Sequence, residues 1–130
     1  MQVSQMNDLS QNDRTKLAGM IVKMFDHWEL SILDQLALLG LSSRSRSVLA
    51  RYRKGKPLSS NRDLIDRVGN LLGIHKSLRL LFPKNQELAY RWMNQPNKAF
   101  GGQTPTNIIK SNGFTGLLMV RTYLDRIRKQ

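Results

Sequence analysis

Apolar residues recur at intervals of three and four along almost the whole chain, as they do on one face of an amphipathic helix. The first such segment covers residues 15–28 and predicts a helix. Its apolar face consists of Leu17, Met20, Ile21, Met24 and Trp28. Almost every later periodic segment follows the same spacing, so the pattern predicts an all-α fold.

A second helix is predicted over the segment ILDQLALL, which follows Ser31. The side chain of Ser31 can cap the helix by accepting a backbone N–H bond. Asp34 would lie in the first turn, where the helix dipole favours an anion. Gly40 would end the helix, because glycine adopts positive φ without strain.

The next segment, LSSRSRSVLARYRKGK, predicts a third helix that is capped by Ser42 or Ser43 and closed by Gly55 and Pro57. One face would carry Val48, Leu49 and Tyr52, and the other Arg44, Ser47 and Arg51, flanked by Arg46 and Arg53. A short helix, a glycine turn and a basic second helix are typical of a helix-turn-helix, whose second helix enters the major groove. Gly40 lies unusually far from Val48, which indicates a lengthened turn and leaves the register of the DNA-reading helix open.

The charge distribution favours a nucleic-acid partner. The chain has 21 Lys+Arg, 9 Asp+Glu and a net charge of +12. Residues 42–62 contain seven Lys/Arg and no acid, so about one sixth of the chain carries more than half of the net charge. Clustered cations gain free energy by displacing counterions from phosphates, whereas a merely solvated surface usually mixes both signs. The predicted DNA contacts are Ser43, Arg44, Arg46, Ser47, Arg51, Arg53, Lys54 and Lys56.

A long helix is predicted after Pro57, with Ser60 or Asn61 as its cap. Its apolar stripe consists of Leu64, Ile65, Val68, Leu71 and Leu72, continued by Leu78, Leu81 and Phe82. Gly69 and Gly73 allow either close helix contact or a break near Gly73. Pro83 ends the stripe, and a short helix then leads to Trp92. This stripe looks too long for one small core to cover, which favours a homodimer.

The segment PNKAFGGQTPTNII begins at Pro96 and predicts a corner between helices. Gly101 and Gly102 would form the corner, and Thr104 would cap a helix that has proline at its first position. The sequence SNG at 111–113 would end this helix, and a last helix would start at Phe114. Leu117, Val120, Leu124 and Ile127 share one side of that last helix.

The sequence contains no recognisable set of catalytic or metal-binding residues. Cysteine is absent, which excludes disulfides and thiolate metal sites. His27 and His75 have no partner at metal-ligand spacing, and no nucleophile–base set stands out. We therefore expect a protein that is not an enzyme, without catalytic residues, metal or cofactor. Trp28 and Trp92 are expected in the core, while Tyr52 and Tyr90 could stack on bases.

No apolar run approaches the roughly 18 residues that a membrane span needs. Residues 1–13 lack the basic and then apolar pattern of a signal peptide and are predicted to be a polar tail. We therefore expect a cytoplasmic protein with no membrane partner.

The C-terminal half resembles the toxin-binding domain of the Xre/MbcA/ParS antitoxins. The resemblance rests on three segments in order: RVGNLLGIHKSLRLLFP, RWMNQPNKAFGGQTP and GLLMVRTYLDRI. The upstream segment WELSILDQLALLGLSSRSRSVLARYRKG is similar to the helix-turn-helix half of the same family, so the resemblance covers about residues 15–128.

The resemblance implies a cognate toxin as partner, often of the RES type, which consumes NAD. It implies that the C-terminal domain covers the toxin's active site, and that the antitoxin and its higher-order complex with the toxin repress their own operon at promoter DNA. By this analogy the toxin contacts are Arg121, Tyr123, Leu124, Arg126, Ile127, Arg128 and Lys129.

The expected organisation is a tail at 1–13, a DNA-binding helix-turn-helix unit at 14–59 and a helical dimerisation and toxin-binding unit at 60–130. Two alternatives stay open. One is a helix-turn-helix transcription regulator without a toxin, and the other is a basic, RNA-associated helical protein.

Overall fold

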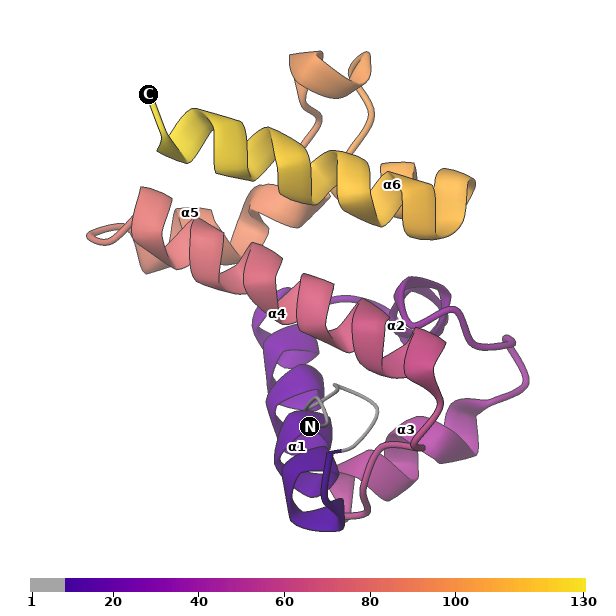
Figure 1. Cartoon of the computed structure of the whole chain (residues 1–130). Coiled ribbons are helices and arrows are strands. Elements are labelled where there is room, and N and C mark those ends of the chain that lie inside the picture. Colours follow the sequence, from indigo (N-terminus) through magenta and orange to yellow (C-terminus); the bar gives the residue numbers. More distant parts are fainter. Residues whose placement is uncertain (1–8) are drawn as a thin grey trace, which may run out of the picture.

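The computed structural model describes residues 9–130, and these residues form helices and connecting turns with no strand, which confirms the all-α prediction. α4 runs through the middle of the molecule, with α6 on one side and α1 and α3 on the other (Figure 1). The elements are α1 (Gln11–His27), α2 (Ile32–Leu38), α3 (Arg46–Arg53), α4 (Arg62–Leu81), α5 (Gln86–Arg91), the 3-10 helices η2 (Trp92–Asn94) and η3 (Lys98–Phe100), and α6 (Pro105–Arg128).

The first helix begins at Gln11, four residues before the predicted start at Thr15. Ser10 and Asp13 form a capping box, in which each side chain accepts a hydrogen bond from the other's backbone N–H. The last residues of the predicted tail therefore form the first turn of α1. The rest of that prediction, residues 1–8, lies outside the described residues.

The apolar face predicted for α1 is partly wrong. Met20 is 52% exposed, whereas Ala18, Val22 and Phe25 are buried together with Ile21. These four residues follow the i, i+3, i+4, i+7 spacing of a helix face. Met20 lies off that face, although its distance from Met24 gave it a place in the predicted stripe.

Three of the predicted helix caps are confirmed. Ser31, Asn61 and Thr104 each accept a backbone N–H bond from the residue three positions later. The cap predicted for α3 is wrong, because this helix begins after Ser45, whose side chain makes no capping bond. Ser42 Oγ instead accepts from the Arg44 N–H, within the turn that precedes α3.

The central helix α4 is continuous through Gly73, so close contact rather than a break explains this glycine. A Cβ atom at Gly73 would lie 2.5 Å from the guanidinium carbon of Arg121. Arg121 also donates to Asn70 Oδ1 over 3.0 Å. Gly73 thus provides the space in which an arginine of α6 crosses α4.

The segment that begins at Pro96 forms a closed loop that turns the chain into α6. The Asn97 N–H donates to Gln103 O over 3.1 Å, and the Gly102 N–H donates to Asn97 O over 3.0 Å. Gly101 and Gly102 have φ values of 66° and 86°, which confirms the predicted glycine corner. These contacts indicate that the loop has an architectural role.

The last two predicted helices form one element, α6, with a sharp kink at Gly113, where φ is 60° and ψ is −138°. The kink brings the two parts of α6 together, because a Cβ atom at Gly116 would lie 2.4 Å from Ile108 O. After the kink Leu117, Val120 and Leu124 are fully buried, as the spacing predicted.

A single hydrophobic cluster extends from Ala18 in α1 to Leu124 in α6 and includes residues of both predicted units. The long stripe of α4 contributes Leu64, Val68 and Leu71 to this cluster. Most of the stripe is thus covered within one chain, although Leu72 and Phe82 are only partly buried, so its length does not supply the argument for a dimer that the sequence suggested.

Candidate functional site

The basic helix α3 exposes one continuous polar face, which is the candidate nucleic-acid interface. Leu49 and Tyr52 hold the helix in the core and Val48 is half-buried. The exposed residues of the opposite face follow helical spacing and are Arg46, Ser47, Ala50, Arg51 and Lys54. A helix of this shape can place arginine forks against base edges or phosphate oxygens in a major groove.

The turn before α3 is long. α2 ends at Leu38 and α3 begins at Arg46, which leaves seven residues between them, whereas a usual helix-turn-helix has about three or four. The lengthened turn is therefore confirmed. Ser43 and Arg44 are exposed in this turn, so Arg44 does not share the helix face predicted for it with Ser47 and Arg51.

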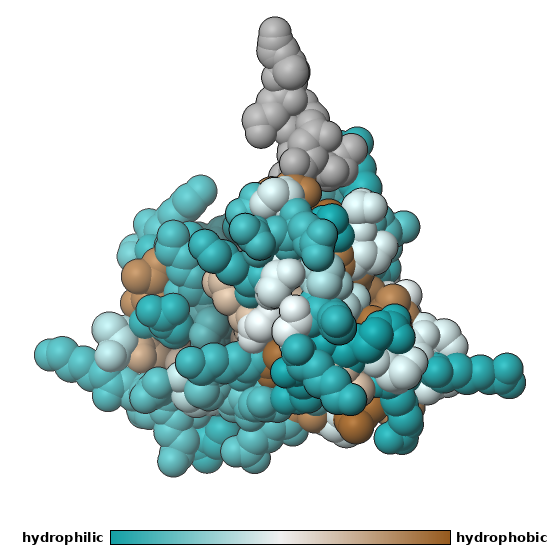
Figure 2. Space-filling model, turned by 90° about the horizontal axis from the view of Figure 1, so that it is seen from below, coloured by the Kyte–Doolittle hydropathy of each residue, from teal (hydrophilic) through white to brown (hydrophobic). Residues whose placement is uncertain are grey.

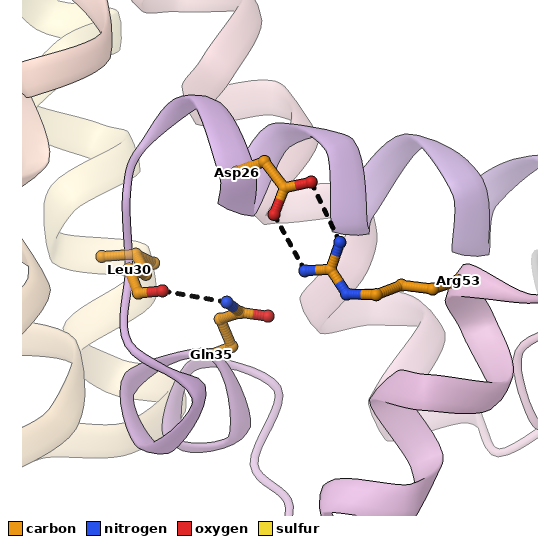
Figure 3. Close-up of polar contacts among 4 residues, drawn as sticks. All are labelled: Asp26, Leu30, Gln35 and Arg53. Carbon is orange, nitrogen blue, oxygen red and sulfur yellow. Dashed lines mark hydrogen bonds and ion pairs between the residues drawn. The ribbon is translucent and has the colours of Figure 1, made fainter.

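Arg53 is held by an ion pair that the sequence did not indicate. Its two terminal nitrogens each donate to one carboxylate oxygen of Asp26 over 2.9 Å, as Figure 3 shows. The hydrogen bonds from Arg53 lower the pKa of the Asp26 carboxyl, and they raise the pKa of the guanidinium. Arg53 therefore joins the C-terminal ends of α1 and α3, and its guanidinium is engaged within the chain.

The start of α2 is fixed by a second polar contact in the same view. The buried side-chain amide of Gln35 donates to Leu30 O over 2.9 Å (Figure 3). This bond satisfies a backbone carbonyl at the corner between α1 and α2. Together with the pair between Asp26 and Arg53, it sets the positions of α2 and α3 relative to α1.

The remaining predicted DNA contacts lie at the end of α3. Lys54 and Lys56 are both exposed, close to the turn at Gly55. Figure 2 views the molecule from below, the side of α3 and of the N-terminal end of α1 in Figure 1, and hydrophilic residues cover most of this face. All eight predicted DNA contacts are thus exposed. Seven of them, all but Arg53, form no ion pair with any residue in the range 9–130.

The tyrosines and histidines make contacts that the sequence did not indicate. Tyr52 is 5% exposed, so it packs in the core and does not stack on bases. Tyr90 stacks on His27, with ring centroids 4.4 Å apart, and lies 6.0 Å from His75. The two histidines are therefore not isolated, although 47 residues between them conceal this in the sequence. Burial lowers the pKa of His75, and Arg79 and His27 lower it further.

The second candidate surface is the outer face of α6. Most of the exposed residues after the kink fall on one helical stripe, which we call the α6 stripe: Thr115, Leu118, Met119, Thr122, Arg126 and Lys129. Leu118 and Met119 are each 43% exposed. A shallow groove of about 420 Å³ runs along this stripe and is bounded by Ala99 and Phe100 of the η3 loop. An exposed apolar pair beside cations is typical of a protein-binding surface.

The predicted toxin contacts are divided by their burial. Arg126, Arg128 and Lys129 are exposed, and Arg128 forms an ion pair with Asp125 over 3.5 Å. Tyr123 is half-buried, with Phe100 edge-on at 5.3 Å and Trp92 stacked at 6.3 Å.

Leu124 is 0% exposed and cannot contact a toxin in this fold, so that prediction is corrected. Arg121 is directed toward α4, where it contacts Asn70, and Ile127 is half-buried against the core. Leu118 and Met119 were not among the predicted toxin contacts. Helical spacing places these two neighbouring residues opposite the buried face of Leu117 and Val120, so their exposure could have been predicted from the sequence.

Two negative findings apply to the described part of the chain. In residues 9–130 no group of three or more His, Asp or Glu side chains is placed to hold a metal ion. None of the helices in this range combines the length and the apolar character that crossing a membrane requires.

Comparison with known proteins bears on the second of these surfaces, the one on α6. The family model described as the C-terminal toxin-binding domain of the antitoxins Xre, MbcA and ParS matches residues 77–129, a range that includes α5, the glycine corner and all of α6. The chain is 35% identical over 107 residues to the uncharacterized protein y4oB of Sinorhizobium fredii (strain NBRC 101917 / NGR234), which covers 82% of this chain and 79% of the relative. The kinked helix, its glycine corner and the exposed stripe therefore form the toxin-binding domain of a protein that belongs to the Xre/MbcA/ParS antitoxin family.

Proposed function

We propose that the chain neutralises its toxin by surface contact through the α6 stripe. The observation that carries this proposal is the exposed pair Leu118 and Met119, which lies beside Arg126 on the helix that ends the matched toxin-binding domain. Fully burying an exposed Leu or Met side chain contributes about 1.5–3 kcal/mol, so covering these two, which are 43% exposed, contributes roughly half of that each. The nearby cations favour an acidic rim on the toxin.

We propose further that the toxin is a RES-type enzyme that consumes NAD and that the antitoxin covers its active site. The support for this step is the resemblance described above, in which three segments of the chain match the family pattern in the same order. Arg126 and Lys129 are the cations of the α6 stripe, and neither forms an ion pair with another residue in the range 9–130. They are suited to an active site built to bind the phosphates of a dinucleotide.

The second proposed role is repression of the operon by promoter binding through α3. Arg46 and Arg51 share the exposed face of this helix, and Asp26 fixes its orientation through Arg53. Because two-fold operators are read by dimers, we propose that the promoter-bound form is a homodimer. A regulator without a toxin would need only this surface and would leave the α6 stripe without a partner.

The proposed function is tested by expressing the chain together with the product of the adjacent open reading frame. We expect the two proteins to purify as one complex and the complex to retard duplex DNA from its own promoter. A neighbour that does not bind, combined with intact promoter binding, would support the regulator without a toxin instead. Stronger binding to structured RNA than to promoter duplex would favour the RNA-associated alternative.

A further inference from the structure

A second exposed apolar surface lies away from both proposed sites, in a groove between α1, α4 and α5. Its cavity volume is about 760 Å³. Met20 and Leu80 line the groove while remaining 52% and 53% exposed. Leu72, Phe82 and Pro83 add further apolar surface. A smaller cavity of about 350 Å³ shares Met20, Leu72 and Arg79 and extends the groove toward Tyr90.

The charges that line this groove have one sign. Lys76 and Arg79 line the larger cavity, and Lys23 lines the smaller one. None of the three forms an ion pair with another residue in the range 9–130, and no Asp or Glu lines either cavity.

The combination of apolar side chains and uncompensated cations restricts what can occupy the groove. A second copy of this chain is disfavoured, since a two-fold contact would place Lys76 and Arg79 against their own copies. Residues 26–34 of a second copy combine three acids with the exposed Ile32 and Leu33, but two of those acids, Asp26 and Asp34, are already paired with Arg53 and Lys110. A nucleic acid would satisfy the cations but would leave Met20 and Leu80 without apolar partners.

We propose that this groove binds an acidic, amphipathic segment of the toxin and is a second contact separate from the α6 stripe. The apolar side chains of that segment would cover Met20 and Leu80, and its carboxylates would pair with Lys76 and Arg79. Helices that present apolar residues at i, i+3 and i+4 are the usual occupants of such grooves. The family match begins at residue 77, so Arg79, Leu80 and the α5 side of the groove lie within the toxin-binding domain.

This inference depends on the proposed antitoxin function, and the test separates the two. Lys76→Glu with Arg79→Glu reverses the charge of the groove, and Leu80→Ser removes an apolar contact without changing charge. The control is Lys16→Glu with Arg62→Glu, which makes the same change in net charge at two exposed positions outside the groove. Circular dichroism confirms that each variant is folded.

The affinity of each variant for the purified product of the adjacent open reading frame is then measured by calorimetry. We expect the charge-reversal variant to bind about tenfold or more weakly and Leu80→Ser to bind more weakly than wild type, while the control binds like wild type. If wild type itself does not bind, the proposed function fails. If wild type binds and both groove variants match it, the groove inference alone is wrong.

Sedimentation and promoter binding of the same variants test the other occupants. A dimer that dissociates only when Leu80 is changed would assign the groove to a second copy and overturn the proposal. A loss of promoter affinity in the charge-reversal variant, with unchanged toxin affinity, would assign the groove to nucleic acid and overturn it as well.

Discussion

At the scale of single residues, two glycines inside helices have opposite effects on the stability of the fold. Gly116 is buried in α6, where a Cβ atom would lie 2.4 Å from a backbone oxygen. Gly19 lies exposed in α1, and apart from its chain neighbours and the adjacent backbone of its own helix no atom lies within 4 Å of its Cβ position. The first glycine is required by close packing, whereas the second only increases the flexibility of the unfolded chain and of the helix.

Substitution of each glycine by alanine should therefore have opposite effects. Gly116→Ala should lower the free energy of unfolding by about 1–3 kcal/mol, because a backbone contact must open. Gly19→Ala should raise it by up to about 1 kcal/mol through helix propensity. Urea unfolding followed by circular dichroism measures both, and equal effects of the two substitutions would contradict the packing assigned to the kink.

The environment of His75 leads to a pH dependence of stability. The pKa of His75 is below its ordinary value of 6.5 because the imidazole is buried, with Arg79 and His27 adding to the shift. On acidification the unfolded chain therefore takes up a proton before the folded chain does. The stability that this residue contributes is present above pH 6.5 and is lost as the pH falls below that value toward the lowered pKa.

We expect the urea midpoint to fall between about pH 7 and pH 5, and to fall less in His75→Gln than in wild type. Tyr90 and His27, which stack near the imidazole, stay unchanged in this comparison. An identical pH profile for the two proteins would contradict the assigned environment.

At the scale of elements, the sequence predicted most helices because their causes are local. Caps such as Thr104 with Pro105, and ends such as Gly40, are encoded within four or five residues. The fold class and the periodic stripe of α4 follow from the same spacing. The start of α1 was missed because the capping box of Ser10 and Asp13 was read as part of the tail.

What the sequence could not predict are contacts between residues far apart along the chain. The pair of Arg53 with Asp26 joins two helices across 26 intervening residues and engages within the chain a residue that was predicted to contact DNA. The stack of His27 with Tyr90 depends on the packing of α5 against α1 and α4. The burial of Leu124 was suggested by its spacing, but the resemblance gave it a place among toxin contacts.

The assigned DNA face of α3 makes a quantitative prediction. Arg46→Ala with Arg51→Ala should weaken promoter binding and reduce the slope of log affinity against log salt by about 1.8 if both side chains contact phosphates. A gel-shift titration at several salt concentrations measures this slope. Lys76→Ala with Lys98→Ala removes the same charge elsewhere, and equal losses in the two variants would count against a specific role for α3.

The α6 stripe makes a separate prediction for toxin binding. Deleting residues 121–130 would remove Leu124 from the core, so surface substitution is the cleaner change. Leu118→Glu with Met119→Glu should abolish protection against the toxin and leave promoter binding intact, because both side chains are exposed and remote in sequence from α3. Growth during toxin expression reports protection, and full protection by the folded variant would contradict the assigned stripe.

At the scale of the whole molecule, one core supports three surfaces of two chemical kinds. The α3 face is polar and cationic, while the α6 stripe and the groove between α1, α4 and α5 combine cations with exposed apolar side chains. The ion pair of Lys110 with Asp34, at 2.7 Å, connects α6 directly to α2, the helix that precedes α3.

The central claim is that a toxin binds the α6 stripe directly, and one measurement tests it most directly. The purified chain is titrated into the product of the adjacent open reading frame in a calorimeter, with wild type beside Leu118→Glu, Met119→Glu. The account predicts saturable binding by wild type, with loss of the neighbour's enzymatic activity at the same equivalence point, and neither effect with the variant. Saturable binding and inhibition that are identical for the two proteins would contradict it.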